Sequence, residues 1–187
     1  MNLQKKPYHP SNRVRFSPAL KLSLFALIIA FRIMLSYIQP FSIPPYVQMG
    51  VGFIGSALMG ALVGPIAGFA LGGLSDILTF FIGGGSWGYF FPGYTFSAAL
   101  GGMIYGIGLY RQEKSWQRIM WTVLAVTLIC NIGFGSLWIK MMTGKAWMVF
   151  LPLRVMKNLI SFPLNTMVLT LIFKQATIQR FIQKYEL

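Results

Sequence analysis

The chain has 187 residues, of which 56% are hydrophobic and only 10% charged, and its mean hydropathy is +0.64. A soluble domain carries roughly 25% charged residues because its surface faces water, so this composition excludes a soluble enzyme and indicates a membrane protein. The net charge of +13 does not indicate nucleic acid, because the basic residues lie mostly in gaps between apolar runs and no nucleic-acid-binding motif accompanies them.

Residues 1–16 form a basic segment with two prolines, which we expect at the membrane surface. The apolar stretch after it is too long for a signal peptide, and no small-residue cleavage site follows, so we expect a retained first helix. The later apolar stretches approach the roughly 20 residues that a helix needs to cross a bilayer. The sequence therefore predicts an all-α integral membrane protein with six transmembrane helices over about 17–39, 47–63, 65–82, 93–110, 118–139 and 153–175, followed by a tail over 176–187.

Two features of the connections set the topology. Gly64 and Pro65 leave almost no loop between the second and third helices, which predicts a tight hairpin. The distribution of Lys and Arg places both termini in the cytoplasm, because cytoplasmic loops carry the excess of these residues. The predicted inner side holds Lys5, Lys6, Arg13, Arg15, Lys21, Arg111, Lys114, Arg118, Lys174, Arg180 and Lys184, and the outer side only Lys140, Lys145, Arg154 and Lys157.

Arg32 and Asp76 are charged residues within the first and third predicted helices. Both helices start on the inner side, so both charges fall at a similar depth in the outer half of the membrane. A charge there costs several kcal/mol unless it is paired or hydrated, which makes both residues candidates for ligand binding. The alternative is a structural ion pair that joins the two helices.

The first helix also carries Ala26 and Ala30, a small-residue pair suited to close contact between helices. At 100° per residue, Arg32 points away from this pair. If Arg32 faces the interior of the bundle, the two alanines face outward and are available to a partner, although alanine is also an ordinary helix residue.

The connection before the fourth helix is rich in glycine and aromatic residues, GGGSWGYFFPGY over 83–94. Such a loop can close over a ligand on a rigid scaffold, so its aromatic residues are candidate binding residues. The alternative is a belt of aromatic side chains at the membrane interface. The candidates are Trp87, Tyr89, Phe91 and Tyr94.

Arg154, Lys157 and Asn158 open the last helix with i, i+3, i+4 spacing, so they share a face. Two cations on one face suit a dicarboxylate, because an Arg fork and a Lys charge both recognise carboxylate oxygens. Since these residues lie near the outer end of the helix, the alternative is that both cations extend to water.

Several kinds of chemistry are not indicated. The sequence has no GxxxxGK[ST], GxSxG or HExxH motif, so we expect neither an enzyme nor an ATPase. Cys130 is the single cysteine and His9 the single histidine, and they do not form a metal-binding cluster. No cofactor or metal is expected.

These segments together resemble the substrate-binding S components of energy-coupling factor (ECF) vitamin transporters, most closely the folate-specific members. The resemblance covers about 17–175 and rests on the alanine pair, GGLSD at 72–76, GGGSWGYFFPGYTFSAALGGMIYG at 83–106 and LPLRVMKNLI at 151–160. It implies six helices, capture of one vitamin from outside, and docking through the alanine face onto a transmembrane coupling protein with two ATPase subunits.

The candidate residues are compatible with folate. A carboxylate such as Asp76 can accept from the donors of a pterin edge, and aromatic residues, now including Trp138, can stack on flat rings. Arg32, Arg154 and Lys157 are candidates for the glutamate carboxylates. The alternatives are an S component for another vitamin and a membrane scaffold that binds no ligand.

Overall fold

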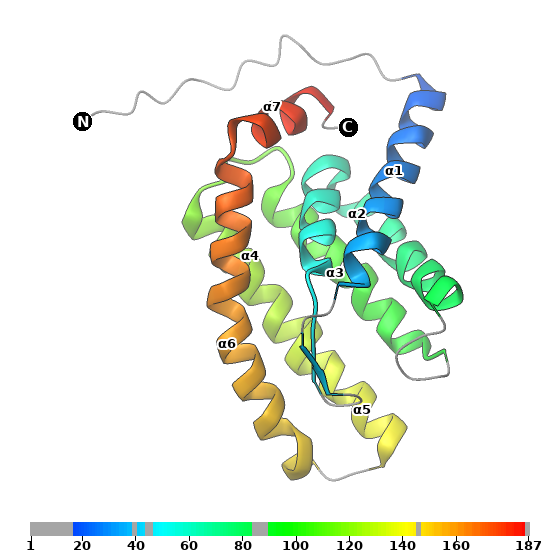
Figure 1. Ribbon diagram of the computed structural model, residues 1–187, viewed down its shortest axis with the longest axis vertical. Coiled ribbons are helices and arrows are strands. Elements are labelled where there is room, and N and C mark those ends of the chain that lie inside the picture. The colour runs from blue at the N-terminus through cyan, green and yellow to red at the C-terminus, as the bar shows by residue number, and fades with distance from the viewer. Residues whose placement is uncertain (1–16, 39–40, 44–46, 84–89, 145–146, 186–187) are drawn as a thin grey trace, which may run out of the picture.

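The computed structural model describes residues 17–38, 41–43, 47–83, 90–144 and 147–185. The chain forms a bundle of helices with one short β-hairpin (Figure 1). The elements are α1 (Pro18–Ser36), β1 (Phe41–Ile43), β2 (Val47–Met49), α2 (Gly52–Gly83), α3 (Pro92–Leu109), α4 (Trp116–Val126), the π-helix η1 (Thr127–Phe134), α5 (Gly135–Thr143), α6 (Trp147–Lys174) and α7 (Ala176–Tyr185).

α2 consists of two helices joined at Gly64, which has a left-handed φ of 81° that favours glycine. Arg32 donates hydrogen bonds to both halves, from Nε to Ser56 Oγ (2.9 Å) and from Nη1 to the Gly72 carbonyl oxygen (2.8 Å). In a straight helix, residues this far apart would be separated by about 24 Å. The two halves therefore fold back on each other as the predicted hairpin.

The predicted start of the second helix at residue 47 is wrong. Residues 47–49 form β2, which pairs antiparallel with β1 so that Ile43 lies opposite Val47 and Phe41 opposite Met49. Pairing with β1 holds residues 47–49 in extended backbone, and α2 begins only at Gly52.

The fifth predicted helix extends over Trp116–Thr143 as α4, η1 and α5. The π-helix in its middle was not predicted. α6 begins at Trp147, six residues before the predicted start, and contains Pro152 and Pro163.

The C-terminal tail predicted over 176–187 is a helix over most of its length. α7 turns sharply from α6 and lies across the end of the bundle (Figure 1). Ile182 is 1% exposed and belongs to the hydrophobic core, against which Ile178 and Tyr185 also pack. Their i, i+4, i+7 spacing gives one apolar face, too short a pattern to register as a membrane span.

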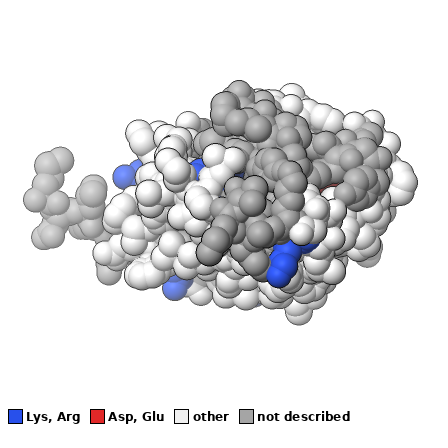
Figure 2. Space-filling view, turned by 90° about the horizontal axis from the view of Figure 1, so that it is seen from below, with Lys and Arg blue, Asp and Glu red and all other residues white. Residues whose placement is uncertain are grey.

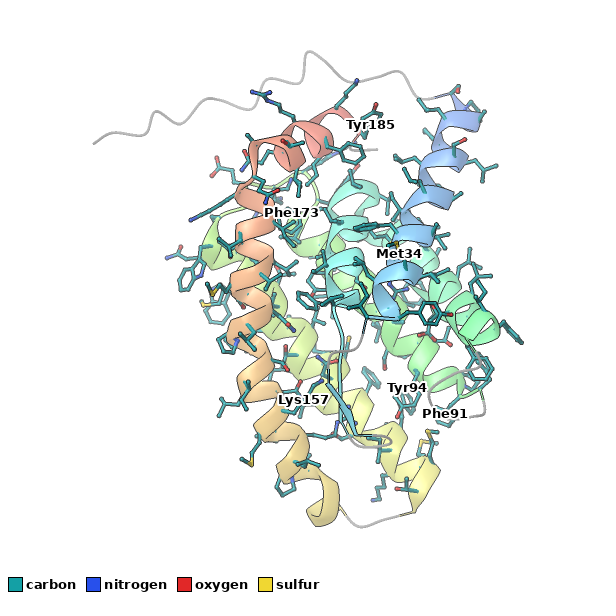
Figure 3. All side chains as sticks on the ribbon, viewed as in Figure 1. Met34, Phe91, Tyr94, Lys157, Phe173 and Tyr185 are labelled. Carbon is teal, nitrogen blue, oxygen red and sulfur yellow. The ribbon has the colours of Figure 1, made fainter. Side chains whose placement is uncertain are left out.

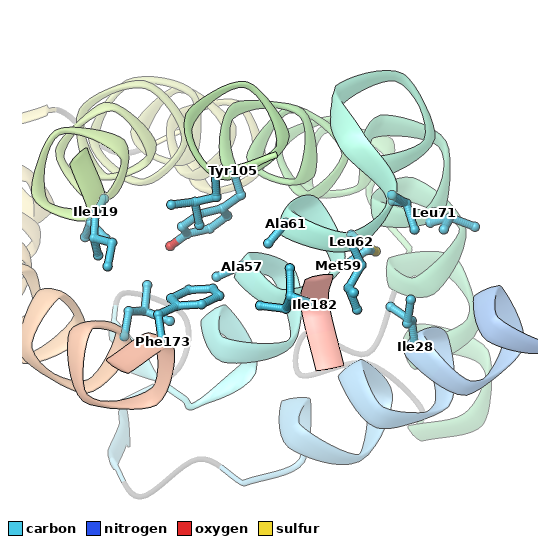
Figure 4. Packing of buried hydrophobic residues seen from close by; sticks show 14 of the residues in the cluster. Ile28, Ala57, Met59, Ala61, Leu62, Leu71, Tyr105, Ile119, Phe173 and Ile182 are labelled. Atoms are coloured by element: carbon cyan, nitrogen blue, oxygen red, sulfur yellow. The ribbon is translucent and has the colours of Figure 1, made fainter. Parts of the chain in front are cut away.

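The bundle therefore has two ends, which we call the α7 end and the β-hairpin end. α1 begins and α6 finishes at the α7 end (Figure 1). Buried side chains from several helices fill this part of the bundle, among them Tyr105, Ile119, Phe173 and Ile182 (Figure 4). The β-hairpin end, seen in Figure 2, shows Lys and Arg at only a few places on its described surface.

Within the described residues, four helical stretches are long and apolar enough to cross a membrane: Pro18–Ser36, Gly52–Gly83, Trp116–Thr143 and Leu151–Lys174. The second contains the hairpin at Gly64, and α3 lies beside it. The predicted all-helical membrane fold is confirmed, with the short β-hairpin as an addition.

Candidate functional site

A cavity of about 360 Å³ lies between α1, α2, α3, α4, η1, α5 and α6. Its size falls within the roughly 300–1,000 Å³ of small-molecule sites. Three sequence-predicted residues line it, namely Arg32, Tyr94 and Arg154. The remaining lining residues are Ser36, Gly50, Gly52, Phe53, Ser56, Ser97, Ala98, Gly101, Tyr105, Val123, Val126, Thr127, Cys130, Asn131, Gly135 and Asn165.

Arg32 is held by the α2 hairpin. Its bonds to Ser56 and Gly72 use Nε and Nη1, so further guanidinium donors remain for the cavity. α1 approaches α2 closely here because Gly55 has no side chain: a Cβ on Gly55 would lie 2.8 Å from the Arg32 Cα. The glycine thus fixes the position of the charge.

Asp76 does not form the ion pair with Arg32 that the structural alternative requires, because no Arg32 nitrogen lies within 4 Å of its carboxylate. Instead, Thr95 Oγ1 donates to Asp76 Oδ2 at 2.9 Å, which joins the second half of α2 to α3. Asp76 also does not line the cavity. Since it follows Gly72 by one helical turn, it lies beside the site and within electrostatic range of Arg32.

Arg154 points into the bundle, so the alternative in which it extends to water is wrong. Its Nη1 donates to the Gly135 carbonyl oxygen, at the junction of η1 and α5. A Cβ on Gly135 would lie 2.6 Å from Arg154 Nη2, so a larger residue here would push the end of the arginine side chain aside. π-Helical turns are frequent at functional sites, and here the turn presents its carbonyl group to a cavity-lining arginine.

Lys157 and Asn158 do not line the cavity, unlike Arg154. Lys157 is half-buried, and Figure 3 places it in the same half of the bundle as Phe91 and Tyr94, but it does not line the cavity. Asn158 is 2% exposed and donates from Nδ2 to the Arg154 carbonyl oxygen at 2.9 Å. The structure therefore brings one of these three residues into the cavity.

Aromatic side chains cluster near the start of α3, and of these Tyr94 lines the cavity. Phe91 contacts both Tyr94 and Trp138, with ring centroids 5.9 and 5.7 Å apart, and Trp138 stacks on Phe134 at 5.7 Å. The Trp138 indole N–H donates to Ser97 Oγ at 2.8 Å, so the cluster positions a cavity-lining hydroxyl group. Of the other predicted aromatic candidates, Trp87 and Tyr89 lie outside the described residues.

Ala26 and Ala30 are exposed, along with neighbouring apolar side chains of α1 such as Leu22 and Met34. Arg32 is on the opposite side of the helix, directed at α2. The alanine pair is therefore separate from the cavity.

Several lining residues were not predicted from the sequence, most clearly Asn131 and Asn165. Both are amide side chains inside apolar spans, where a polar residue is rare and marks a functional position. Their position inside apolar spans is therefore the sequence signal that indicates them. Ser56 and Ser97 could not have been found in this way, because serine is common in membrane helices.

The charged side chains that line the cavity are all positive. Two arginines line it, and its described lining includes no Asp or Glu. Its other polar groups are hydroxyls and amides, so the site favours an anionic ligand that also carries hydrogen-bonding groups. No group of three metal-ligating side chains occurs among the described residues.

Comparison with known proteins shows the family to which the chain belongs. The model of the family "ECF transporter, substrate-specific component" matches residues 20–173. Two curated proteins, each named "Folate transporter FolT", are 34% identical to the chain. The protein of Clostridium novyi (strain NT) matches over 67% of this chain and 72% of its own length, and that of Leuconostoc mesenteroides subsp. mesenteroides over 63% and 66%.

Two solved structures share the fold. "Crystal structure of FolT bound with folic acid" has a TM-score of 0.71 and 28% identity, and the match covers 79% of this chain and 88% of that one. The S component for biotin from an ECF-type ABC transporter has a TM-score of 0.64, with 89% and 99% covered, and at 17% identity it supports the fold alone. The chain belongs to the substrate-specific component family of ECF transporters.

Proposed function

We propose that this chain is the folate-binding S component of an ECF-type importer, a multi-pass protein of the cell membrane that captures the vitamin from outside. The observation that carries the proposal is the cavity of about 360 Å³ lined by Arg32 and Arg154. The two curated relatives named folate transporters and the related structure with folic acid support folate as the ligand.

The residues fit the chemistry of folate. Its glutamate end carries two carboxylates, and arginine binds carboxylates through paired, charge-assisted hydrogen bonds. Tyr94, which lines the cavity, suits the flat rings of the vitamin, and Phe91 packs behind it in contact with Trp138. Lys157 and Asp76 lie outside the lining and would act at its edge, Lys157 by adding positive charge and Asp76 by balancing Arg32.

The proposal includes a partner, because the chain has no nucleotide-binding motif of its own. Transport requires a module with a transmembrane coupling protein and two ATPase subunits, and the exposed face around Ala26 and Ala30 would dock on it. In this arrangement both termini lie in the cytoplasm, as the distribution of basic residues favours, and the β-hairpin end faces outward.

Calorimetry on the detergent-solubilised chain tests the proposal. Wild type should bind folate saturably, and Arg154→Ala should weaken folate binding about tenfold or more, because it removes charge-assisted hydrogen bonds. The control is Arg180→Ala, which removes an exposed arginine of α7 and should leave the affinity unchanged.

Pteroate lacks the glutamate and sharpens the test. It should bind wild type and Arg154→Ala with similar affinity, while folate distinguishes them. Equal losses for both ligands would mean that Arg154 supports the fold or the pterin. Wild type that binds another vitamin in preference to folate, or no ligand at all, would contradict the proposal and favour a different S component or a scaffold.

A further inference from the structure

α7 has one face in the hydrophobic core and a positively charged face opposite to it. Ile178 and Ile182 pack into the core, whereas Arg180 and Lys184 are exposed. At 100° per residue the two cations lie about 40° apart, on the side of the helix away from Ile182. Like charges four residues apart on a helix repel each other, and α7 contains no Asp or Glu to offset them. An anionic group against this face would therefore stabilise it.

One flank of α7, between the core face and the cations, is aromatic. Phe181 is 40% exposed, and its ring centroid lies 4.8 Å from that of Tyr185. Lys184 Nζ lies 5.2 Å from the centroid of the Tyr185 ring. Aromatic rings beside a lysine are typical of the membrane–water interface, where the rings contact the apolar layer and the charge reaches the headgroups.

The outward face of α6 indicates where the bilayer ends. Leu164, Met167 and Leu171 are 49%, 61% and 56% exposed, and their spacing places them on one face of this membrane-spanning helix. Lys174 continues the same face in the last turn of α6 and is also exposed. A lysine at the end of an apolar, lipid-facing stripe lies at the level of the headgroups. Because α7 begins two residues later, it lies at that level too.

The start of α4 marks the same level independently. Trp116 is the first residue of α4 and is 52% exposed, as expected for tryptophan at a membrane interface. One turn later, Ile119 belongs to the core cluster that also contains Phe173 and Ile182 (Figure 4). α4 therefore begins at the end of the bundle where α6 finishes and α7 lies.

We propose that α7 is an interfacial helix that binds anionic phospholipids of the leaflet at the α7 end. Arg180, Lys184 and Lys174 contact the phosphate groups, and Phe181 lies at the boundary of the acyl chains. A phospholipid supplies both chemistries, phosphate oxygens for the cations and an apolar chain for the ring, whereas an acidic protein surface would match the cations alone. This surface is separate from the cavity, so the inference does not depend on which ligand the cavity binds.

The experiment measures the lipid composition next to α7 in the full chain. Cys130 is the single cysteine, so Cys130→Ala allows a neutral fluorophore to be attached at Phe181→Cys alone. The labelled chain is placed in vesicles of phosphatidylcholine that contain either brominated phosphatidylglycerol or brominated phosphatidylcholine at the same mole fraction. Bromine quenches the fluorophore only at close range, and the ratio of quenching by the two lipids gives the local preference for the anionic one.

The variants remove the cations from one end of the bundle or the other. Each cation near an anionic lipid contributes about fivefold to the preference, so the labelled chain should prefer phosphatidylglycerol about tenfold or more. Adding Arg180→Gln and Lys184→Gln should remove most of this preference, and so should high salt. The control is Lys140→Gln, which removes an exposed lysine from α5 and should leave the preference unchanged.

Three outcomes would overturn the inference. A label that neither brominated lipid quenches would show that this flank of α7 faces water or a protein. Equal quenching by the two lipids would show that α7 does not select anionic lipid. A preference that persists without Arg180 and Lys184 would assign it to other residues. In the chain that retains Cys130 and Phe181, the double glutamine variant should keep wild-type folate affinity, so this inference and the proposed function fail separately.

Discussion

Two faces of α3 differ: one packs directly on α2, whereas the other lines the cavity, and two adjacent glycines mark the difference. A Cβ on Gly102 would lie 2.2 Å from the Gly68 carbonyl oxygen, so α2 and α3 touch there through their backbones. A Cβ on Gly101 would meet nothing within 4 Å, and this residue lines the cavity. The same helix is thus both scaffold and wall, depending on the direction in which a residue points.

The comparison shows how a small membrane protein makes room for a ligand. Close contacts such as Gly60 against Gly106 fix the α2 hairpin on α3 and gain van der Waals contact where the hydrophobic effect contributes little. With that contact fixed, side chains of α1, η1 and α6 can line a cavity beside it without loss of the fold. The following predictions test this division, from the largest expected effect to the smallest.

Gly102→Ala should cause the largest effect, because backbone cannot move aside as a flexible side chain can. We expect the free energy of unfolding to fall by about 2 kcal/mol or more. Gly101→Ala is the matched control, and its stability should change by less than about 1 kcal/mol. Thermal unfolding in detergent measures both. Similar losses of stability in the two variants would show that the two faces of α3 do not differ in packing.

Arg32→Gln should weaken folate binding about thirtyfold, because charge-assisted hydrogen bonds contribute about 1.5–3 kcal/mol. It should also lower stability, since Arg32 joins α1 to both halves of α2. Calorimetry and thermal unfolding separate the two effects. Lys174→Gln, which removes an exposed charge at the end of α6, is the control. Reduced stability with unchanged affinity would assign Arg32 to the scaffold alone.

Asp76→Asn should have a smaller effect, about threefold on folate affinity. Asparagine can still accept the hydrogen bond from Thr95, and the change removes only the negative charge beside Arg32. Folate binding to the variant measures this. A loss of tenfold to a hundredfold, the size expected for a lost charge-assisted bond to the ligand, would mean that Asp76 accepts directly from the pterin.

Ala30→Trp should have the smallest effect on the chain itself, with folate affinity within about twofold of wild type, because Ala30 is exposed and directed away from the cavity. Uptake into vesicles with the ATPase-containing partner module should nevertheless be lost, since a bulky side chain prevents close helix contact. A variant that loses binding but still assembles would show that the two faces of α1 are assigned the wrong way round.

Sequence by itself determined the features that depend on local chemistry. Low charge and long apolar runs required a membrane fold, and Gly64–Pro65 required a sharp turn because glycine adopts a positive φ and proline can begin the next helix. Helical periodicity separated Arg32 from Ala26 and Ala30. It also located Arg154, although not its partner Gly135.

Tertiary structure decided the features that depend on distances between remote segments. Arg32, Asn131, Arg154 and Asn165 share one cavity, whereas Asp76 and Lys157, which looked equally suitable in the sequence, lie beside it. The π-helix, the β-hairpin and α7 also escaped prediction, because each is short and is stabilised by its neighbours as well as by its own residues. Periodicity shows which residues share a face of one helix, but only packing decides which faces enclose the same space.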